Sequence, residues 1–337
     1  MSAALVVAAV ILVALVVYTL TAGADFGGGV WDLLARGRTA AAEHRLIDRA
    51  IAPIWEANHV WLILVVVLLF VCFPAAYAGI STVLHIPLTV MLVGVVLRGS
   101  AFTFAAYDPM PGGGARRFRR LFAISSLLTP VALGVVLGAV STAVEVDPRT
   151  GRVVGDFVSA WLEPYPFAVG LFVLALFAYL AAVYLIHEAD DEALRVIFRR
   201  RAQVSGVLTG GAALLAFLVA REGAPRIHEG LVSAAWSTPL HLVTGAAALV
   251  ALWALHRRRD HLARAAAMLQ AALIVVGWGL AQYPYLAVPG YTIEGAAAPE
   301  GVLWPVLIAL AAGSVLLLPA LVYLVRVFKA RPVRGDG

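Results

Sequence analysis

Two carboxylates lie inside strongly apolar stretches of the chain. Asp25 is found in Gly23-Ala-Asp-Phe-Gly-Gly-Gly29, and Glu56 in Trp55-Glu-Ala-Asn-His-Val-Trp61. An ionisable side chain well inside a membrane helix costs about 2.5–3.5 kcal/mol on insertion scales, and it usually faces a protein interior or a water path. Two such residues in the first sixty positions predict a place where the chain carries protons or supports chemistry.

Glu56 and His59 are three positions apart, so a helix brings them to one face. The functional interpretation is a proton relay in which Glu56 takes up a proton and passes it inward, with His59 or water next. The structural alternative is a hydrogen-bonded pair that fixes helix packing, or a Glu56 neutralised by Arg98. A di-iron site is not expected, because it needs a second Glu-x-x-His and two further carboxylates, and the sequence has no second such motif.

Asp25 is followed by three glycines and is predicted at the end of the first helix, where a negative charge is unfavourable without a specific partner. The glycines allow close approach by a neighbouring helix or by the edge of a cofactor. Arg98 keeps its proton and must be paired or hydrated. Its expected partners are Glu56, Asp25, or a propionate or phosphate of a neighbouring subunit.

The composition is that of an integral membrane protein. Hydrophobic residues make up 62% of the 337 positions and charged residues 13%, whereas a soluble domain carries about 25% charged residues. The net charge of +5 does not indicate a nucleic-acid partner, because the basic residues lie in short loops between apolar stretches. A single cysteine, Cys72, excludes a disulfide framework and a thiolate metal site. The apolar N-terminus is expected to be an uncleaved first helix.

Nine stretches are long enough to cross a bilayer core of about 30 Å. They run approximately over 3–24, 54–79, 83–106, 120–142, 161–186, 203–220, 236–256, 262–283 and 303–327. The loops after the odd-numbered helices and the C-terminal tail hold 20 basic residues, and the other loops hold 4. The positive-inside rule therefore predicts an external N-terminus and a cytoplasmic C-terminus. This topology places Asp25, Glu56, His59 and Arg98 at one depth, in the cytoplasmic third of the membrane.

Histidines and tryptophans supply the remaining candidates. His85, His187 and His241 lie near membrane ends and could in principle ligate haem, but a lone intramembrane histidine is more often a hydrogen-bonded structural group. Trp55 and Trp61 bracket the turn that holds Glu56. They are either interfacial aromatic residues or walls of a path for a small molecule.

Taken together, these segments resemble subunit II of bacterial cytochrome bd-type quinol oxidases. The resemblance rests on the Asp25 segment, Ala50-Ile-Ala-Pro-Ile-Trp-Glu-Ala-Asn-His-Val-Trp-Leu-Ile63, Leu69-Phe-Val-Cys-Phe-Pro-Ala75, Leu97-Arg-Gly-Ser-Ala-Phe102, Gly277-Trp-Gly-Leu-Ala-Gln-Tyr-Pro-Tyr285 and Ala296-Ala-Ala-Pro299. It spans the chain, and the Trp-acid-x-Asn-x-x-Trp core is its most specific part. The residues of that core, Trp-Glu-Ala-Asn-His-Val-Trp, resemble the cyanide-insensitive branch of the family. Better-known relatives have Asp at the position of Glu56.

The resemblance implies an all-α membrane protein of nine transmembrane helices, arranged as two four-helix bundles and one peripheral helix. The first bundle would cover about 1–142, and the second bundle with the peripheral helix about 161–327. Subunit I would carry haem b and haem d, oxidise quinol and reduce oxygen with protons drawn from the cytoplasm. No haem or metal is assigned to this chain. A small single-helix subunit, membrane lipids and a bound quinone or lipid are further expected partners, in a bacterial cytoplasmic (inner) membrane.

Residue roles follow from the same resemblance. Glu56 is expected on a proton route at the subunit boundary, with His59 and Asp25, and Trp61 and Trp55 would line an oxygen route. Arg98 and Asn58 are expected as interface residues or charge partners. The expected function is that of the haem-poor subunit of a quinol:oxygen oxidoreductase. The alternative is a proton-coupled secondary transporter, which usually shows inverted repeats and acids near the midplane, neither of which is evident here.

Overall fold

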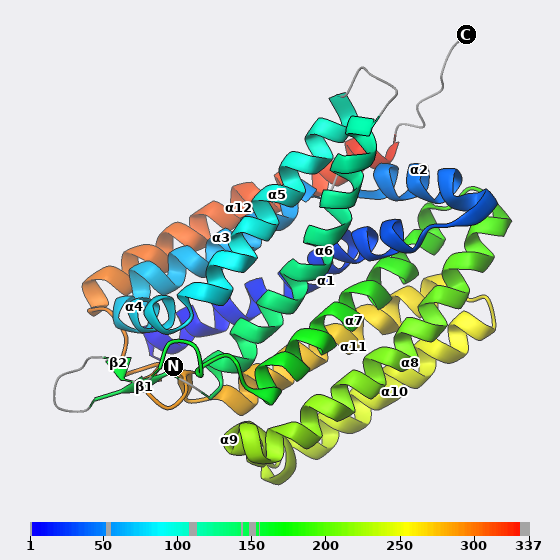
Figure 1. Ribbon diagram of the computed structural model, residues 1–337. Coiled ribbons are helices and arrows are strands. Elements are labelled where there is room, and N and C mark those ends of the chain that lie inside the picture. Colours follow the sequence, from blue (N-terminus) through cyan, green and yellow to red (C-terminus); the bar gives the residue numbers. More distant parts are fainter. Residues whose placement is uncertain are drawn as a thin grey trace.

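The chain is almost entirely helical (Figure 1). The computed structural model describes residues 2–51, 55–107, 113–142, 144–147, 153–154 and 156–330. The first half contains α1 (Ala3–Leu34), the short 3-10 helix η1 (Gly37–Thr39), α2 (Ala40–Ile51), α3 (Trp55–Cys72), α4 (Pro74–Val83), α5 (His85–Tyr107) and α6 (Gly113–Val140). The second half contains α7 (Pro164–Glu188), α8 (Glu192–Gly223), α9 (Pro225–Ser233), α10 (Ser237–His256), α11 (Asp260–Gln282) and α12 (Glu300–Ala330).

Among the described residues, eight helices are individually long and apolar enough to cross a membrane, and the bent pair of α3 and α4 would make a ninth span. The stretch expected as one helix over 54–79 is therefore two helices, broken after Cys72. The chain turns by 117° between α3 and α4, at Phe73 and Pro74. Proline has no backbone N–H and clashes with the preceding turn, so it starts a new helix instead of prolonging α3.

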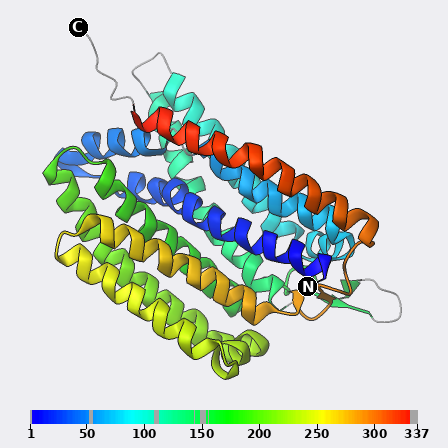
Figure 2. The ribbon, with the colours of Figure 1, turned by 180° about the vertical axis from the view of Figure 1, so that it is seen from behind.

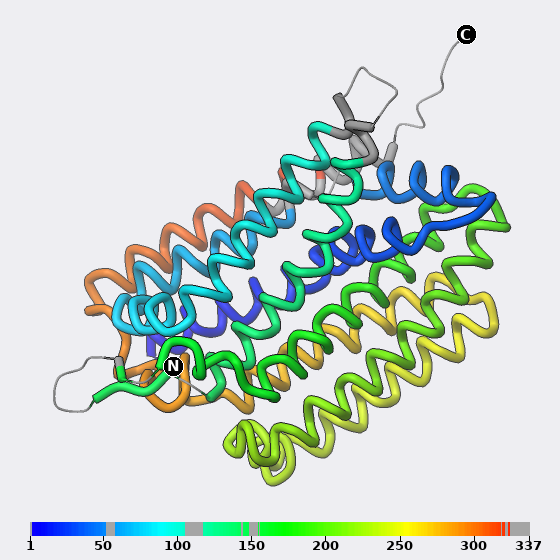
Figure 3. The backbone as a smooth tube through the Cα atoms, in the orientation of Figure 1, coloured from blue at the N-terminus to red at the C-terminus, as the bar shows by residue number. Residues whose placement is uncertain are grey.

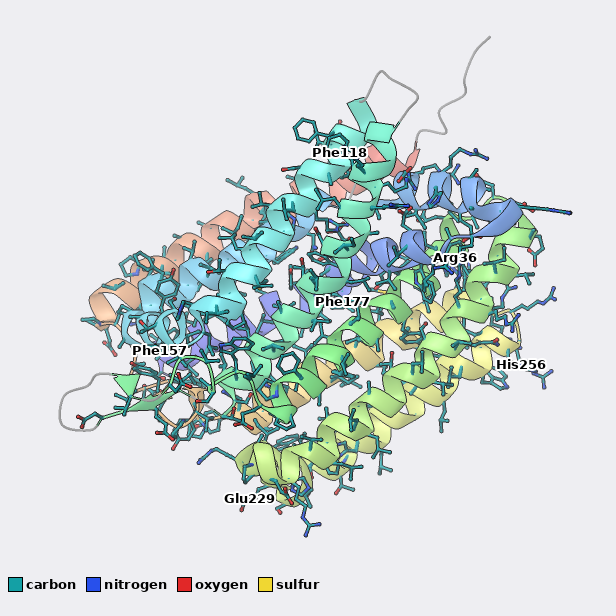
Figure 4. The ribbon with its side chains drawn as sticks, viewed as in Figure 1. Arg36, Phe118, Phe157, Phe177, Glu229 and His256 are labelled. Carbon is teal, nitrogen blue, oxygen red and sulfur yellow. The ribbon has the colours of Figure 1, made fainter. Side chains whose placement is uncertain are left out.

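The first helix is also longer than predicted, because α1 continues through the glycines to Leu34. Asp25 thus lies inside the helix and not at its end, which corrects the predicted position. The glycines remain helical because neighbouring helices pack directly on them. A Cβ on Gly27 would lie 2.0 Å from the backbone oxygen of Phe177 on α7, and one on Gly29 would lie 2.2 Å from Ser126 on α6. Of the two explanations offered for the glycines, close approach by neighbouring helices is the one observed (Figure 4 labels Phe177 near the centre of the molecule).

The long helices run side by side between two ends of the molecule (Figure 3). One end, here called the hairpin end, holds the N-terminus, α4, α9 and two small antiparallel pairs, β1 (Glu145–Val146) with β2 (Val153–Val154) and β3 (Tyr285–Ala287) with β4 (Tyr291–Thr292). The opposite end, called the α2 end, holds η1 and α2. Figure 4 shows Arg36 and His256 at the α2 end, and Phe157 and Glu229 at the hairpin end.

Helix α7 lies at the centre of the packing. It contacts α1, α6, α8 and α11, and its residues from Leu176 to Ile186 are buried except for Tyr184, which is half-buried. Helices α8 and α10 form the outer edge of one side. On the other side, α12 packs along α1 and α3 (Figure 2), and its described side chains are largely exposed. The core therefore holds α1, α6 and α7 rigidly, and α1 is the element that presents the first predicted carboxylate.

Candidate buried charge site

Asp25 and Arg98 form an ion pair in the interior of the chain. The Asp25 side chain is 0% exposed and that of Arg98 is 1% exposed. Arg98 Nη1 donates to Asp25 Oδ2 at 3.0 Å, and Nη2 donates to Oδ1 at 2.5 Å and to the Asp25 backbone oxygen at 2.8 Å. The predicted partner of Arg98 is thus Asp25, and its guanidinium is held by this chain itself. A bidentate contact of this kind is the strongest interaction that an arginine and a carboxylate can form.

The rest of the guanidinium is covered by two helices. Its Nε donates to Ser126 Oγ on α6 at 3.0 Å, and its plane lies over the rings of Phe26 and Phe122, with the central carbon 4.8 Å and 4.7 Å from the ring centroids. Cations over aromatic rings gain electrostatic attraction that increases when water is excluded. A buried charge pair adds stability only when its remaining hydrogen-bonding groups are satisfied, and these contacts meet much of that requirement.

Asn58 connects the charge pair to α3. This fully buried side chain accepts a hydrogen bond from Thr21 Oγ1 at 2.6 Å, and its Nδ2 donates to Asp25 Oδ2 at 3.4 Å. The amide therefore lies between two residues of α1 that are one turn apart. The expectation that Asn58 is a charge partner agrees with this contact to the Asp25 carboxylate.

Glu56 and Trp55 begin α3, but their side chains lie outside the described part of the structure. The position of Glu56 on the helix is nevertheless defined by spacing. Positions 4, 7, 11 and 14 residues further along a helix share its face, and these are occupied by Val60, Ile63, Val67 and Phe70, which are 45–60% exposed. Asn58, Val65, Leu68 and Cys72, all buried, form the opposite face. The Glu56 position thus belongs to the outward face of α3, away from the Asp25–Arg98 pair.

His59 and Trp61 lie closer to the interior. The His59 ring meets the Phe26 ring edge-on, with centroids 6.5 Å apart, and no described group forms a hydrogen bond with its Nδ1. Trp61 is half-buried and packs against the cluster of Tyr18, Ala22 and Phe26. His59 therefore stands beside the charge pair without forming an ion pair with it.

A second group of charges, at the α2 end, was not singled out from the sequence. Asp32, whose side chain is 2% exposed, contacts His44 Nδ1 at 2.6 Å and Arg119 Nη1 at 2.5 Å, and Arg119 also reaches Asp48 at 2.6 Å. These residues come from α1, α2 and α6. The signal available in the sequence was an aspartate seven positions after Asp25, hence on the same face of the helix.

The same end is tied to α8 by a second buried acid. Glu43 of α2 is 2% exposed at its side chain and contacts Arg201 of α8 at 2.7 Å. The Arg201 guanidinium lies over the ring of Trp31, 5.3 Å from its centroid, and Thr39 donates to Glu43 at 2.6 Å. Several arginines that the positive-inside count treated only as loop charges thus also join the helices at this end.

An apolar cavity of about 360 Å³ lies between α1, α3, α5, α6 and α11 toward the hairpin end. Leucine, valine and isoleucine side chains form most of its wall. Its few polar residues include Ser81, Trp278 and Gln282, the last two from α11. Such a cavity suits an apolar chain better than a charged group.

The histidines considered for haem do not gather into one place. His85 begins α5 at the hairpin end, where its Nδ1 lies 2.9 Å from the Thr82 carbonyl oxygen. His187 ends α7, with its ring 4.9 Å from that of His261, and His241 is exposed on α10. Over the described ranges, no three or more His, Cys, Asp or Glu side chains group as metal ligands.

Comparison with known proteins decides the family. The model of the cytochrome bd terminal oxidase subunit II family matches residues 3–328. The chain belongs to this family. A bd oxidase structure from Geobacillus thermodenitrificans has the same fold, with a TM-score of 0.82 and 26% identity over 97% of this chain and 99% of that one.

Curated sequences agree with this assignment. A subunit II relative from Bacillus subtilis (strain 168) is 22% identical over 82% of this chain and 81% of its own length. Subunit 2 of the cytochrome bd-I ubiquinol oxidase of Escherichia coli (strain K12) is 27% identical over 58% of this chain and 52% of its own. This subunit II is therefore a multi-pass membrane component of a terminal oxidase, an oxidoreductase of the respiratory chain, as the sequence motifs predicted.

Proposed function

We propose that the chain is the haem-poor subunit of a quinol:oxygen oxidoreductase, and that it delivers protons to a haem-bearing subunit I. The Escherichia coli relative is named for ubiquinol oxidation, which supports a quinol as the electron donor. The three histidines considered as haem ligands, His85, His187 and His241, lie on three different helices, which supports placing haem b and haem d in the partner. Those haems would supply the redox chemistry of oxygen reduction, and this chain would supply packing, charge and a proton path.

The α2 end is proposed to face the cytoplasm. The basic clusters of η1, α2, the start of α8 and the start of α11 all occur at that end. Positively charged loops remain on the cytoplasmic side during insertion, so this distribution supports an external hairpin end. The bacterial inner membrane is the proposed location, and the two helical bundles and nine spans remain part of the same proposal.

The position of Glu56 on the outward face of α3 carries the functional proposal. A carboxylate facing lipid is costly, and such residues face protein or water. We therefore propose that subunit I covers the outward face of α3 beside Glu56, together with the exposed apolar faces of α5 and α12, and that water reaches Glu56 from the α2 end. At that boundary Glu56 would take protons from the α2 end and pass them toward the partner.

Other predicted residues take supporting roles in this proposal. His59, next along α3, would accept or donate a proton near Glu56, while Asp25 would act as a fixed negative charge beside the path, because Arg98 holds it. Trp61, with Trp55, would border an oxygen route. The apolar cavity offers a place for a lipid chain or a quinone tail, and a small single-helix subunit would complete the complex.

Replacement of Glu56 tests the proposal. Glu56→Gln keeps the size of the side chain but removes its titratable proton, and general acid–base groups typically contribute 10²–10⁴-fold. We expect quinol oxidase turnover in membranes to fall about 100-fold, with normal haem spectra. Glu229→Gln, on the exposed side of α9, is the control and should match the wild type. Unchanged oxygen consumption by Glu56→Gln would remove Glu56 from the route.

A further inference from the structure

Asn58 is a fully buried amide on the helix that carries Glu56 and His59. Among the described side chains of α3, it is the one that hydrogen-bonds to the charge-bearing stretch of α1. We infer that Asn58 is a positioning residue, which fixes the rotation of α3 against the Asp25–Arg98 pair and thereby orients Glu56 toward the subunit boundary. This inference rests on the proposed role of Glu56.

The two hydrogen bonds define the orientation of the amide. A carboxylate can only accept, so the group that meets Asp25 Oδ2 must be the NH₂ of Asn58, and the carbonyl oxygen must point to Thr21. Thr21 Oγ1 lies 2.6 Å from that oxygen, closer than it lies to the backbone oxygens of Val17 and Tyr18, at 3.0 Å and 3.2 Å. The amide therefore has one donor contact and one acceptor contact, both with α1.

The helix period links this contact to Glu56. Residues two positions apart point about 200° apart on a helix, from its 3.6 residues per turn. While Asn58 holds its face of α3 against α1, the Glu56 position is fixed on the opposite face. The apolar contacts of Val65 and Leu68 with α1 also favour this rotation, but they are non-directional. The amide combines a donor and an acceptor, and a rotated α3 could not place both of them correctly against α1.

A packing role alone is a poor explanation for an amide at this position. Burying an amide costs free energy unless it is hydrogen-bonded, and an apolar residue of similar volume would fill the space without that cost. The polar contacts of Asn58 are with Asp25 and Thr21, and Asp25 is itself held by Arg98. The amide thus transmits the fixed geometry of the ion pair to α3.

Two substitutions separate positioning from packing. Asn58→Leu keeps the branching and the number of side-chain heavy atoms, and it removes both hydrogen bonds. Asn58→Asp keeps the acceptor for Thr21, but it donates to Asp25 only while protonated. Asp25 opposes ionisation of the new carboxyl group, whereas Arg98 favours it. The other described titratable groups nearby are Tyr18 on α1 and His59 on α3, both of which interact electrostatically with Asp25. Turnover must therefore be measured as a pH profile against wild type.

The full complex in membranes is the material for the test, with quinol oxidase turnover and haem spectra recorded from about pH 5.5 to 8.5. Misplacement of a reacting group by about 1 Å can reduce rates by about 100-fold. We expect Asn58→Leu to lose 10- to 100-fold in turnover at every pH, with normal haem spectra. Asn58→Asp should match that loss at alkaline pH and recover at least tenfold, relative to Asn58→Leu, as the pH falls. Gln270→Leu, a buried amide on α11, is the matched control and should behave as wild type.

Two results would overturn the inference. One is wild-type turnover in Asn58→Leu, and the other is an equal loss in both variants across the whole pH range, which would indicate packing. If Asn58→Leu does not assemble, the acid recovery of Asn58→Asp still decides the question. A fully active Asn58→Leu beside an inactive Glu56→Gln would refute the positioning role alone. A fully active Glu56→Gln would refute the proton route itself.

Discussion

Removal of the carboxylate alone from the buried ion pair should be far more damaging than removal of both charges. In Asp25→Asn, the Arg98 guanidinium loses both contacts to carboxylate oxygens but keeps its contacts with the Asp25 backbone oxygen, Ser126, Phe26 and Phe122. An arginine cannot become neutral by releasing a proton. Breaking a buried pair in this way costs about 3–5 kcal/mol.

The reverse substitution should be milder. In Arg98→Met the remaining Asp25 can take up a proton and become neutral, which limits the penalty of leaving it buried. In the double variant Asp25→Leu/Arg98→Met no charge is left in the interior, and apolar replacement of a buried pair is often neutral or stabilising. The expected order of stability is therefore the double variant first, Arg98→Met next and Asp25→Asn last.

The assay is the amount and heat resistance of assembled complex in membranes, followed by the reduced-minus-oxidised haem spectrum. A loss of 3 kcal/mol corresponds to about a 100-fold change in an equilibrium ratio, so Asp25→Asn should yield little assembled complex or an altered spectrum. Arg49→Met is the control, because Arg49 and Asp190 form an exposed pair, and such pairs contribute about 0–1 kcal/mol. The reasoning fails if Asp25→Asn assembles normally, or if the double variant is as poor as Asp25→Asn.

Two further perturbations follow from the packing and from the α2 end. Gly27→Ala should sharply reduce the amount of assembled complex on a gel of membrane extracts, because its Cβ would lie 2.0 Å from a backbone oxygen of α7. Gly210→Ala, which has open space around it, is the control and should leave the yield unchanged. Equal yields of the two variants would contradict the close approach of α1 and α7. Asp32→Asn should lower the midpoint temperature of thermal inactivation without lowering turnover at the optimum temperature. The substitution weakens the contacts of Asp32 with His44 and Arg119, and hydrogen bonds to charged groups contribute about 1.5–3 kcal/mol each. A loss of turnover at unchanged heat resistance would instead place Asp32 on the proton path.

Much of the fold could be predicted because bilayer thickness imposes a clear length on apolar stretches. The sequence identified Asp25 and Arg98 as costly buried charges, and it named Asp25 among the candidate partners of Arg98. It could not choose between Asp25 and Glu56, because equal depth does not define which faces of two helices meet. The structure resolves that choice through the rotation of α1 and α5.

Helix ends were predicted less well, and the reasons are local. The first apolar stretch was predicted to end near Asp25, but α1 continues through three glycines, because tertiary packing by α6 and α7 outweighs their low helix propensity. Ser126 was overlooked because one hydroxyl in an apolar span is common. Its importance comes from Arg98, which is 28 residues away in the sequence. At the α2 end, only the basic residues were recognised, as topology signals, and the acids that they contact were not singled out, since these contacts depend on how α2 folds back.

The sharp turn between α3 and α4 has a consequence for the surrounding lipid. At about 1.5 Å per residue, the 18 residues of α3 extend only about 27 Å, whereas the 32 residues of α1 extend about 48 Å. A span shorter than the hydrocarbon layer is accommodated by local thinning of the bilayer. Beside α3 the headgroups and water should therefore lie nearer to Glu56 than the average membrane thickness suggests, so that hydrophobic mismatch itself brings the solvent to the start of the proposed route.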